Sequence, residues 1–329
     1  SVFRKAAELD LPSQLEYLID DATGDMLSLE QLSQALTGDT IAVGRVGVLV
    51  DYPTAEEGLT ASEVSQMGLS ARIKPYKTES IINWATESVG STSVISMVVL
   101  RENITVLSDD GFEWVPVTQY RVLKLIEGVY TQIVMDDEDN IISVAEPRQA
   151  DGATFNVIPF IFIGSENNDP DVDSAPLYDM ANINIGHYKN SADYEELIHI
   201  SGNPTLMIST NFSAEEFSEA NPNGIKVGSR SGHNLGPGGS AQFLQVNPTQ
   251  VADEAMQRKE QQAVMTGARL VMPQSGVETA EAARIRNSAD NSVLSIIVNN
   301  VEDGVKRALE FCVMFMGGNP DDVVYELNK

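Results

Sequence analysis

The spacing of hydrophobic positions changes along the chain from helical to strand-like and back again. Near the start, apolar side chains recur at helical spacing in Pro12–Asp20 and Ser28–Leu36, which predicts short helices. The apolar run Ile41–Val50 that follows is typical of a buried strand. A polar stretch then leads to Ser80–Val89, which we predict to be a short helix holding Trp84.

The region after Ser93 has the pattern of a sheet. Short apolar runs separated by turn residues predict five strands, at Val94–Leu100, Gln119–Glu127, Tyr130–Met135, Ile141–Val144 and Val157–Ile163. The acidic cluster Asp136–Asn140 lies between two of these runs, and we interpret it as a solvated hairpin turn rather than a metal site.

Helical spacing returns in the next part of the chain and is then interrupted by an insert. Leucines, isoleucines and small residues three and four positions apart predict a helix from Pro176 to about Ile200. The insert 204–246 is irregular and contains a glycine-rich run, Gly232–Ser240, that predicts a flexible loop. Its strand candidates are Thr205–Ser209, Ile225–Val227 and Gln242–Val246.

Two further helices are predicted on either side of a Pro/Gly break. The first begins at the cap residue Asn247 and runs to about Leu270. It is polar on nearly every side, so it must bridge between bodies or be supported by neighbours. The second helix begins with the capping box of Ser275 and Glu278 and extends to Met316, with a kink expected in Asn287–Ser292. Its apolar stripe consists of Leu294, Ile297, Val298, Val301, Val305, Ala308, Leu309, Cys312 and Met316.

Composition narrows the class of protein. At 329 residues the chain is long enough for two or three substructures, and 42% hydrophobic residues suffice for a core. The net charge of −27 argues against a conventional DNA-binding face. It is compatible with a surface along which DNA slides without binding, or with a charge that serves only to keep the protein soluble. The lone Cys312 excludes an internal disulfide and predicts a reducing, intracellular origin. No apolar run is long enough for a membrane helix, and the start at Ser1 predicts a processed or trimmed product.

No motif for a nucleotide, metal or catalytic site is complete in the sequence. Gly44 and Gly47 lack the third glycine and the Lys-Ser/Thr pair of a phosphate loop, so we interpret them as structural glycines in a strand. Asp169, Asp171 and Asp173 alternate as in a calcium loop, but the sixth and twelfth positions are not the required Gly and Glu. His187 and His199 lie too far apart around their helix to share a ligand. We therefore expect no catalytic residues, no metal and no cofactor.

Four segments carry a family resemblance, and their order matters more than any one of them. They are GRVGVLVDYP (Gly44–Pro53), KPYKTESIINW (Lys74–Trp84), the apolar IPFIFI followed by an acidic turn and Pro176–Pro204, and the helix–loop–helix segment Thr266–Ser292. With this order the chain resembles the portal proteins of tailed bacteriophages over nearly its whole length.

The resemblance implies an α+β, portal-like fold. It assigns residues 1–175 to an α/β wing, 176–203 to a first stem helix, 204–246 to a clip, 247–270 to a second stem helix, 271–277 to a tunnel loop, and 278–329 to a long wing helix leading towards a crown that is absent or truncated.

The resemblance also implies a function without catalysis. Portal proteins form rings, here expected to have about twelve subunits, at one capsid vertex of the virion. Double-stranded DNA is packaged and ejected through the ring, which docks the terminase motor and later the head–tail adaptor. The expected partners also include the major capsid and scaffolding proteins, but no membrane. Assembly is expected in the cytoplasm of the bacterial host.

Three groups of site residues follow from the resemblance. The uncharged tunnel loop, expected to act as a steric gasket in the DNA channel, is Met272, Pro273, Gln274, Ser275, Gly276 and Val277. The second group could contact the DNA backbone or form ion pairs between subunits, and we favour the ion pairs. Its members are Arg258, Lys259, Arg269, Arg284 and Arg286. The residues of the clip expected to face the motor and adaptor are Ile225, Lys226, Arg230, His233 and Asn234.

Two other classes of protein remain as alternatives. The first is another virion assembly protein, either a capsid subunit or a head–tail adaptor, although a capsid subunit would not need two long helices flanking a loop. The second is a carboxylate- or calcium-dependent hydrolase, which would require a metal dependence that no motif in the sequence demands.

Overall fold

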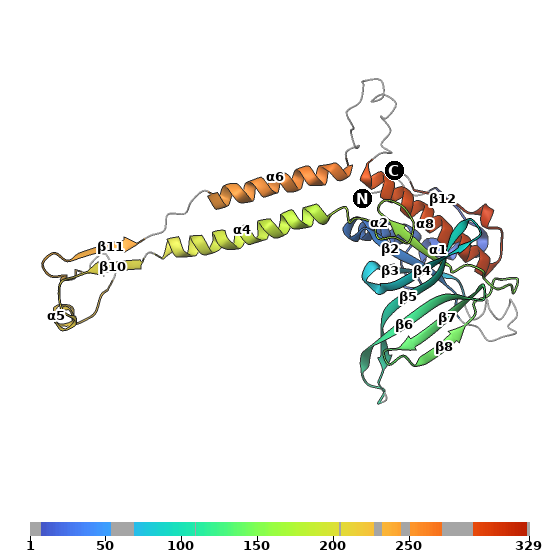
Figure 1. The fold of residues 1–329 in the computed structure, drawn as a ribbon, viewed down its shortest axis with the longest axis horizontal. Helices are drawn as coiled ribbons and strands as arrows, with labels where there is room; N and C mark the ends of the chain where they lie inside the picture. The colour runs from blue at the N-terminus through green and yellow to red at the C-terminus, as the bar shows by residue number, and fades with distance from the viewer. Residues whose placement is uncertain are drawn as a thin grey trace, which may run out of the picture. The chain divides into compact units, whose positions relative to one another are not determined.

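The computed structural model describes residues 8–53, 69–108, 110–203, 205–226, 232–244, 251–271 and 292–327, except the side chains of 269–271. The chain forms two compact units. The first consists of Ser1–Asp179 and Gly267–Lys329, and the second of Met180–Thr266. Both contain helices and strands, so the fold is of the mixed α and β class (Figure 1).

A three-stranded antiparallel sheet lies at the centre of the first unit. Its order is β3 (Arg72–Lys77), β2 (Arg45–Asp51) and β9 (Phe160–Gly164). All five residues of β9 are buried, as expected for a strand covered on both faces. The predicted strand Val157–Ile163 is therefore present, but it begins three residues later than expected.

The predicted strand Ile41–Val50 also begins late. Residues as far as Val43 belong to the helix α2 (Leu29–Val43), which Ser28 caps through its side chain. Gly44 ends this helix with φ +86°, a left-handed conformation that glycine adopts without steric cost. The interpretation of Gly44 as a strand glycine is wrong, whereas Gly47 does lie within β2.

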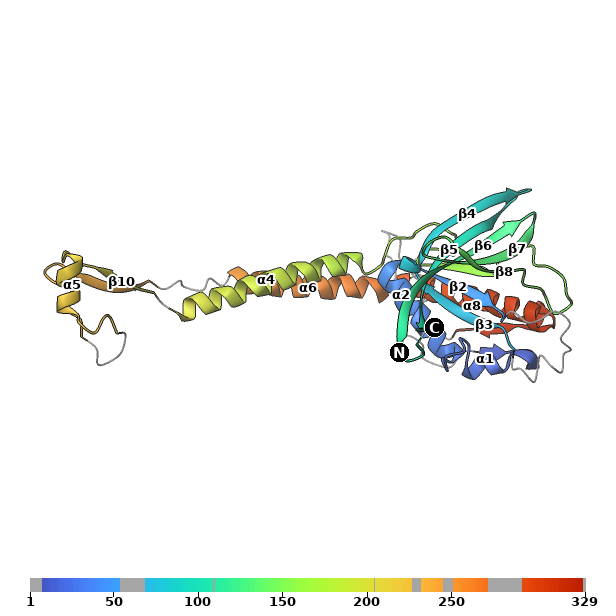
Figure 2. The same cartoon turned by 90° about the horizontal axis from the view of Figure 1, so that it is seen from below.

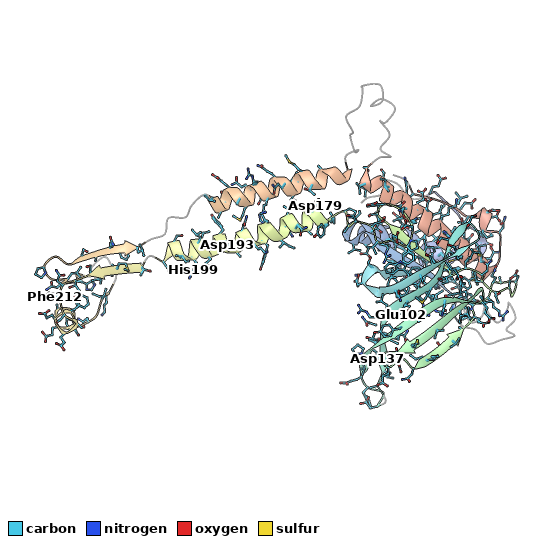
Figure 3. The ribbon with its side chains drawn as sticks, in the orientation of Figure 1. Glu102, Asp137, Asp179, Asp193, His199 and Phe212 are labelled. Atoms are coloured by element: carbon cyan, nitrogen blue, oxygen red, sulfur yellow. The ribbon has the colours of Figure 1, made fainter. Side chains whose placement is uncertain are left out.

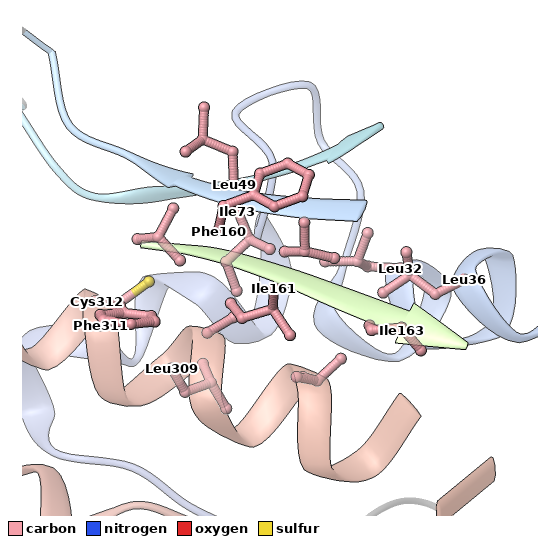
Figure 4. Packing of buried hydrophobic residues seen from close by; sticks show 14 of the residues in the cluster. Leu32, Leu36, Leu49, Ile73, Phe160, Ile161, Ile163, Leu309, Phe311 and Cys312 are labelled. Atoms are coloured by element: carbon pink, nitrogen blue, oxygen red, sulfur yellow. The ribbon is translucent and has the colours of Figure 1, made fainter. Parts of the chain in front are cut away.

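Two helices cover one face of this sheet. α8 (Val293–Met316) and α2 pack on each other and on the sheet, and the short η1 (Ser13–Leu15) and α1 (Tyr17–Asp20) lie beside them. Figure 4 shows Ile161 and Ile163 of β9 next to α8. The predicted apolar stripe is confirmed: Cys312 and six others of its members are buried, and the remaining two are half-buried against the core.

α8 begins at Val293 and is not continuous with any helix before it. The backbone of Ser292 is extended, and its side chain accepts a hydrogen bond from the Ser295 backbone N–H as an N-cap. The non-helical residue Ser292 lies at the end of Asn287–Ser292, the stretch in which a kink is expected. Residues 272–291 lie outside the described part of the chain.

The second sheet of this unit has five antiparallel strands in sequence order. They are β4 (Ile81–Val89), β5 (Thr92–Leu107), β6 (Trp114–Ile126), β7 (Val129–Asp136) and β8 (Ile141–Ala145). The four strands predicted in β5–β8 are confirmed, and the Asp136 carboxylate accepts the backbone N–H groups of Glu138 and Asn140 in the predicted hairpin turn.

The predicted helix at Ser80–Val89 is wrong, because this segment is η2 (Thr78–Ser80) followed by β4. β4 pairs with β5 from Ile81 to Val89, and Trp84 packs edge-on against Phe162 at a ring-centroid distance of 6.2 Å. Strand pairing and this tertiary contact override a local pattern that is too short to separate helix from strand.

A third, two-stranded sheet joins distant parts of the first unit. β1 (Glu8–Asp10) pairs with β12 (Val324–Glu326), which follows η4 (Pro320–Asp322). Tyr325 of β12 forms a 2.6 Å hydrogen bond with Ser33 of α2, so the strand is fixed to the helical layer. The sequence pattern did not predict either strand, since each has only three residues.

The second unit contains two long helices and a small two-stranded antiparallel sheet, which we call the β hairpin although a long segment with a helix connects its strands (Figures 1 and 2). α4 (Tyr178–Gly202) leads to β10 (Thr205–Ser209), α5 (Ala214–Ala220), β11 (Ser240–Leu244) and α6 (Val251–Val271). The strand prediction for β10 is confirmed and that for β11 is confirmed in part. Ile225 and Lys226 have no strand structure, and α5, with its capping box of Ser213 and Glu216, was not predicted.

Candidate functional site: the paired helices and hairpin of the second unit

α4 and α6 bury almost none of their side chains. α8 in the first unit buries eleven of its 24 residues, whereas α4 buries only Ser201 out of 25. In α6, no side chain between Val251 and Ala268 is buried. Because most of a helix's stability in a protein comes from packing an apolar face, two helices this exposed require further contacts.

The two helices contact each other at one level through neighbouring residues. A Cβ atom placed on Gly186 of α4 would lie 2.8 Å from the Lys259 Nζ atom of α6, so the lysine crosses the helix where the side chain is missing. The next residue, His187, lies with Nε2 3.4 Å from a carboxylate oxygen of Glu260. His187 Nε2 makes no hydrogen bond by geometry, so we treat this approach as packing and not as a strong ion pair.

Each helix also has exposed apolar side chains directed away from this contact. At about 100° per residue, Ile185 and Tyr188 point roughly 180° away from the Gly186–His187 side of α4, and they are 53% and 75% exposed. On α6, Met265 points roughly 170° and Val264 roughly 90° away from the middle of the Lys259–Glu260 side, and they are 68% and 74% exposed. The helix pair thus has two different apolar flanks, which we name the α4 flank and the α6 flank.

The predicted cationic residues are separated by the structure. Arg258 is exposed on α6 and forms no ion pair among the described residues, whereas Lys259 is directed towards α4. The side chain of Arg269, the residues Arg284 and Arg286, and the whole predicted tunnel loop Met272–Val277 lie outside the described residues. Of the five cations, Arg258 is therefore the one seen to be available for a partner.

The β hairpin is the second exposed part of this unit. Its register pairs Thr205 with Leu244 and Ser209 with Ser240, and every residue of β11 is exposed. Phe243 and Leu244 are 53% and 60% exposed. A two-stranded hairpin with so little burial is at best marginally stable alone in water. It too requires further contacts, which makes it a candidate docking surface.

Hydrogen bonds organise the loops beside this hairpin. The His233 Nε2 atom lies 2.7 Å from the Lys226 carbonyl oxygen, and Asn221 exchanges hydrogen bonds with the backbone of Asn234 at 2.9 and 3.2 Å. Of the five predicted clip residues, these contacts involve Lys226, His233 and Asn234; Ile225 precedes Lys226 in the chain, and Arg230 lies outside the described residues. The sequence analysis missed Asn221, because an asparagine that bonds to distant backbone has no local signature.

Two further observations concern membrane spans and metal sites. No helix among the described residues is long and apolar enough to cross a membrane. Nor do the described residues contain a cluster of three or more His, Cys, Asp or Glu side chains that could hold a metal ion.

Residues 176–316 match a family described as "Domain of unknown function (DUF4055)". No curated protein matches the chain. Among solved structures, the chain is similar to one from "Virion of native gene transfer agent (GTA) particle", with 14% identity and a TM-score of 0.48 over 98% of this chain and 76% of that one. It is also similar to one from "Neck of native GTA particle computed with C12 symmetry", with 13% identity, a TM-score of 0.49 and the same coverage.

Proposed function

We propose that this chain is a portal protein, which forms a ring at one capsid vertex through which double-stranded DNA enters and leaves a phage-like particle. The observation that carries the proposal is the pair of unlike apolar flanks on α4 and α6. The order of sequence segments that resembles portal proteins supports it independently.

Unlike flanks favour a ring over a simple dimer. A two-fold dimer brings the same patch of both copies together, whereas the α4 flank and the α6 flank are different surfaces on opposite sides of one helix pair. If the α4 flank of one copy packs on the α6 flank of the next, each copy has two neighbours, and the contact repeats until the ring closes. Both helices then gain the packing that they lack in a single chain.

Charge and the exposed hairpin fit the other tasks of such a ring. A net charge of −27 disfavours tight binding of phosphate, which suits a channel that passes DNA without retaining it. The hairpin β10–β11 and the loops around His233 form the clip, the surface that we assign to the terminase motor and then to the head–tail adaptor. In this proposal the chain performs no catalysis, and Arg258 forms an ion pair with a neighbouring copy.

The number of copies per particle tests this function against the other assembly roles. Quantitative mass spectrometry on purified particles that contain the chain is expected to give one ring, about twelve copies, per particle. A capsid subunit would be present in a large excess over one ring and would contradict the proposal. Particles that retain a full shell and full DNA content without the chain would contradict it equally.

A further inference from the structure

A loop of the first unit connects the central sheet to the start of α4. It runs from the end of β9 to three residues before the helix, Gly164–Ala175, and we name it the junction loop. Its last residue already contacts the helix, because the Tyr178 backbone N–H donates to the Ala175 carbonyl at 3.0 Å. Tyr178, the first residue of α4, thus belongs to the same unit as this loop and is hydrogen-bonded to it.

α8 holds the beginning of the junction loop with a reciprocal pair of side-chain bonds. The Asn300 amide of α8 donates to the Gly164 carbonyl at 2.8 Å. In return, the Asn168 amide of the loop donates to the Asn300 carbonyl, also at 2.8 Å, and its oxygen accepts the Gly164 N–H. Each asparagine thus satisfies backbone groups of the other segment, so neither segment can shift alone without losing hydrogen bonds.

The sheet holds the middle of the loop through Arg45 of β2. This side chain is 1% exposed, and its guanidinium lies 4.2 Å from the Trp84 ring centroid and 5.0 Å from that of Phe162. Arg45 Nη1 donates to the Pro170 carbonyl, and the carboxylates of Asp169, Asp171 and Asp173 in the loop act on the cation electrostatically. Burial lowers the pKa of Arg45, and these three carboxylates oppose that shift.

Hydrogen bonds also link residues within the junction loop to one another. The Asp173 carboxylate accepts the N–H groups of Glu166 and Asn167 at 2.8 and 3.4 Å. Ser165, which is buried, donates from its backbone to the Gly44 carbonyl and from its hydroxyl to the Ser174 carbonyl, both at 2.8 Å. These bonds join the start of the loop, at Ser165–Asn167, to its end, at Asp173 and Ser174.

We propose that the junction loop is a mechanical coupling, through which α8 and the first turn of α4 move together. α8 starts at the cap residue Ser292, immediately after the segment that the sequence assigns to the tunnel loop and its following helix. A change at this cap would act on α8 first and, through Asn300, on the start of α4 at Tyr178. The coupling goes beyond the proposed function and does not depend on it, so its test can fail while the chain still forms a ring.

Hydrogen exchange of the intact protein, followed by mass spectrometry, tests the hydrogen-bonded link. Asn300→Ala is expected to speed the exchange of the amides of Ser165, Glu166, Asn167 and Tyr178 by about tenfold, since the loop loses one of its ties to α8. Asn299→Ala is the matched control, because Asn299 is the preceding residue of α8 and its side-chain oxygen bonds to no described residue. It is expected to leave those four amides unchanged.

A double-mutant cycle tests the coupling itself. Ser292→Ala removes the cap of α8 and is expected to speed exchange at Tyr178 by about fivefold in the natural sequence. In the Asn300→Ala background, Ser292→Ala is expected to cause no further increase in the exchange rate of the Tyr178 amide. If Asn300→Ala does not fold, Asn168→Ala, which breaks the other half of the pair, replaces it in the same cycle. The proposal would be overturned if Ser292→Ala did not speed the exchange of the Tyr178 amide in the natural sequence. It would also be overturned if the increase were the same in the Asn300→Ala background.

Discussion

Arg121 of β6 donates two hydrogen bonds to the Glu102 carboxylate of β5, from Nε at 2.6 Å and from Nη2 at 3.2 Å. Their side chains are only 15% and 12% exposed. Figure 3 labels Glu102 on the five-stranded sheet. Tyr76 of β3 also donates to this carboxylate, at 2.5 Å, so the pair ties the five-stranded sheet to the three-stranded one. The network thus joins side chains of both sheets in the first unit.

Removing one member of the pair is expected to be costly. Arg121→Met leaves the Glu102 carboxylate buried without its cation and is expected to lower the free energy of unfolding by about 3 kcal/mol. Denaturant unfolding at a fixed protein concentration measures this loss. Glu87→Ala, an exposed position on β4 of the same sheet, is the control and is expected to change stability by less than about 0.5 kcal/mol. A loss in Arg121→Met no larger than in the control would show that the network is dispensable.

The same carboxylate predicts a pH dependence. Burial alone would raise the pKa of Glu102, but the hydrogen bonds and charge of Arg121, with bonds from Tyr76 and Gln119, bring it below its usual value. Since the folded pKa lies below the unfolded one, the linked stability is complete above pH about 4.3 and is lost as pH falls through the folded pKa. The stability difference between the natural chain and Glu102→Gln is therefore expected to be constant from pH 6 to 8 and to shrink below about pH 4.3. A difference that grows on acidification would contradict the assignment.

Two glycines of α2 are expected to respond to alanine with opposite signs. At Gly44, φ is +86° and a Cβ would lie 2.6 Å from the Asp173 carbonyl oxygen, so Gly44→Ala is expected to destabilise the chain by about 2 kcal/mol. At Gly38, inside the same helix, a Cβ would meet nothing within 4 Å beyond the helix's own backbone and the adjacent residues, and Gly38→Ala is expected to stabilise it by about 0.5–1 kcal/mol. Thermal unfolding of the two variants checks both signs, and a stabilising Gly44→Ala would show that the helix end is misplaced.

Alanine at Gly186 of α4 tests how the paired helices fit. The added Cβ would lie 2.8 Å from Lys259 Nζ, the far end of a flexible side chain that can move aside. The helix propensity gained, about 1 kcal/mol, is therefore expected to outweigh the adjustment, and Gly186→Ala is expected to be neutral or stabilising. The double variant Gly186→Ala/Lys259→Ala is the control for the contact. A strong loss in the single variant, restored in the double, would show that the Lys259 position is rigid.

If the α4 flank and the α6 flank form the contact between copies, a charge placed on either flank is expected to disrupt the ring. Tyr188→Asp places a charge in the centre of the α4 flank and is expected to shift the protein from rings to smaller species, measured by size-exclusion chromatography with light scattering. Met26→Asp, at an equally isolated and 88% exposed position of the first unit, is the control and is expected to leave rings intact. Rings that persist in Tyr188→Asp would show that this flank does not form the contact between copies.

Helices and strands with strong periodicity could be predicted from the sequence, and short or ambiguous elements could not. The stripe of α8 was predicted because seven of its apolar residues recur at the helical period and are buried in the same core. β4 was missed because a short segment with Trp84 fits both periods, and only pairing with β5 decides between them. β1 and β12 have three residues each and exist because they pair across the chain.

The candidate site was predicted only in outline. A polar α6 indicated a need for neighbours, and this agrees with the lack of burial in the structure. Composition does not show that Lys259 is directed towards α4 while Arg258 is exposed, since adjacent residues of one type differ only in the direction set by the helix. The Asn168–Asn300 pair joins residues far apart in sequence, and no local pattern records such a contact.

The mass and symmetry of the purified protein test the central claim most directly. Native mass spectrometry, combined with class averages from electron microscopy, is expected to show a closed ring of about twelve copies with an axial hole wide enough for a DNA duplex. A protein that stays monomeric or dimeric at micromolar concentration, including when it is produced with any segments that flank this chain, would contradict the portal assignment.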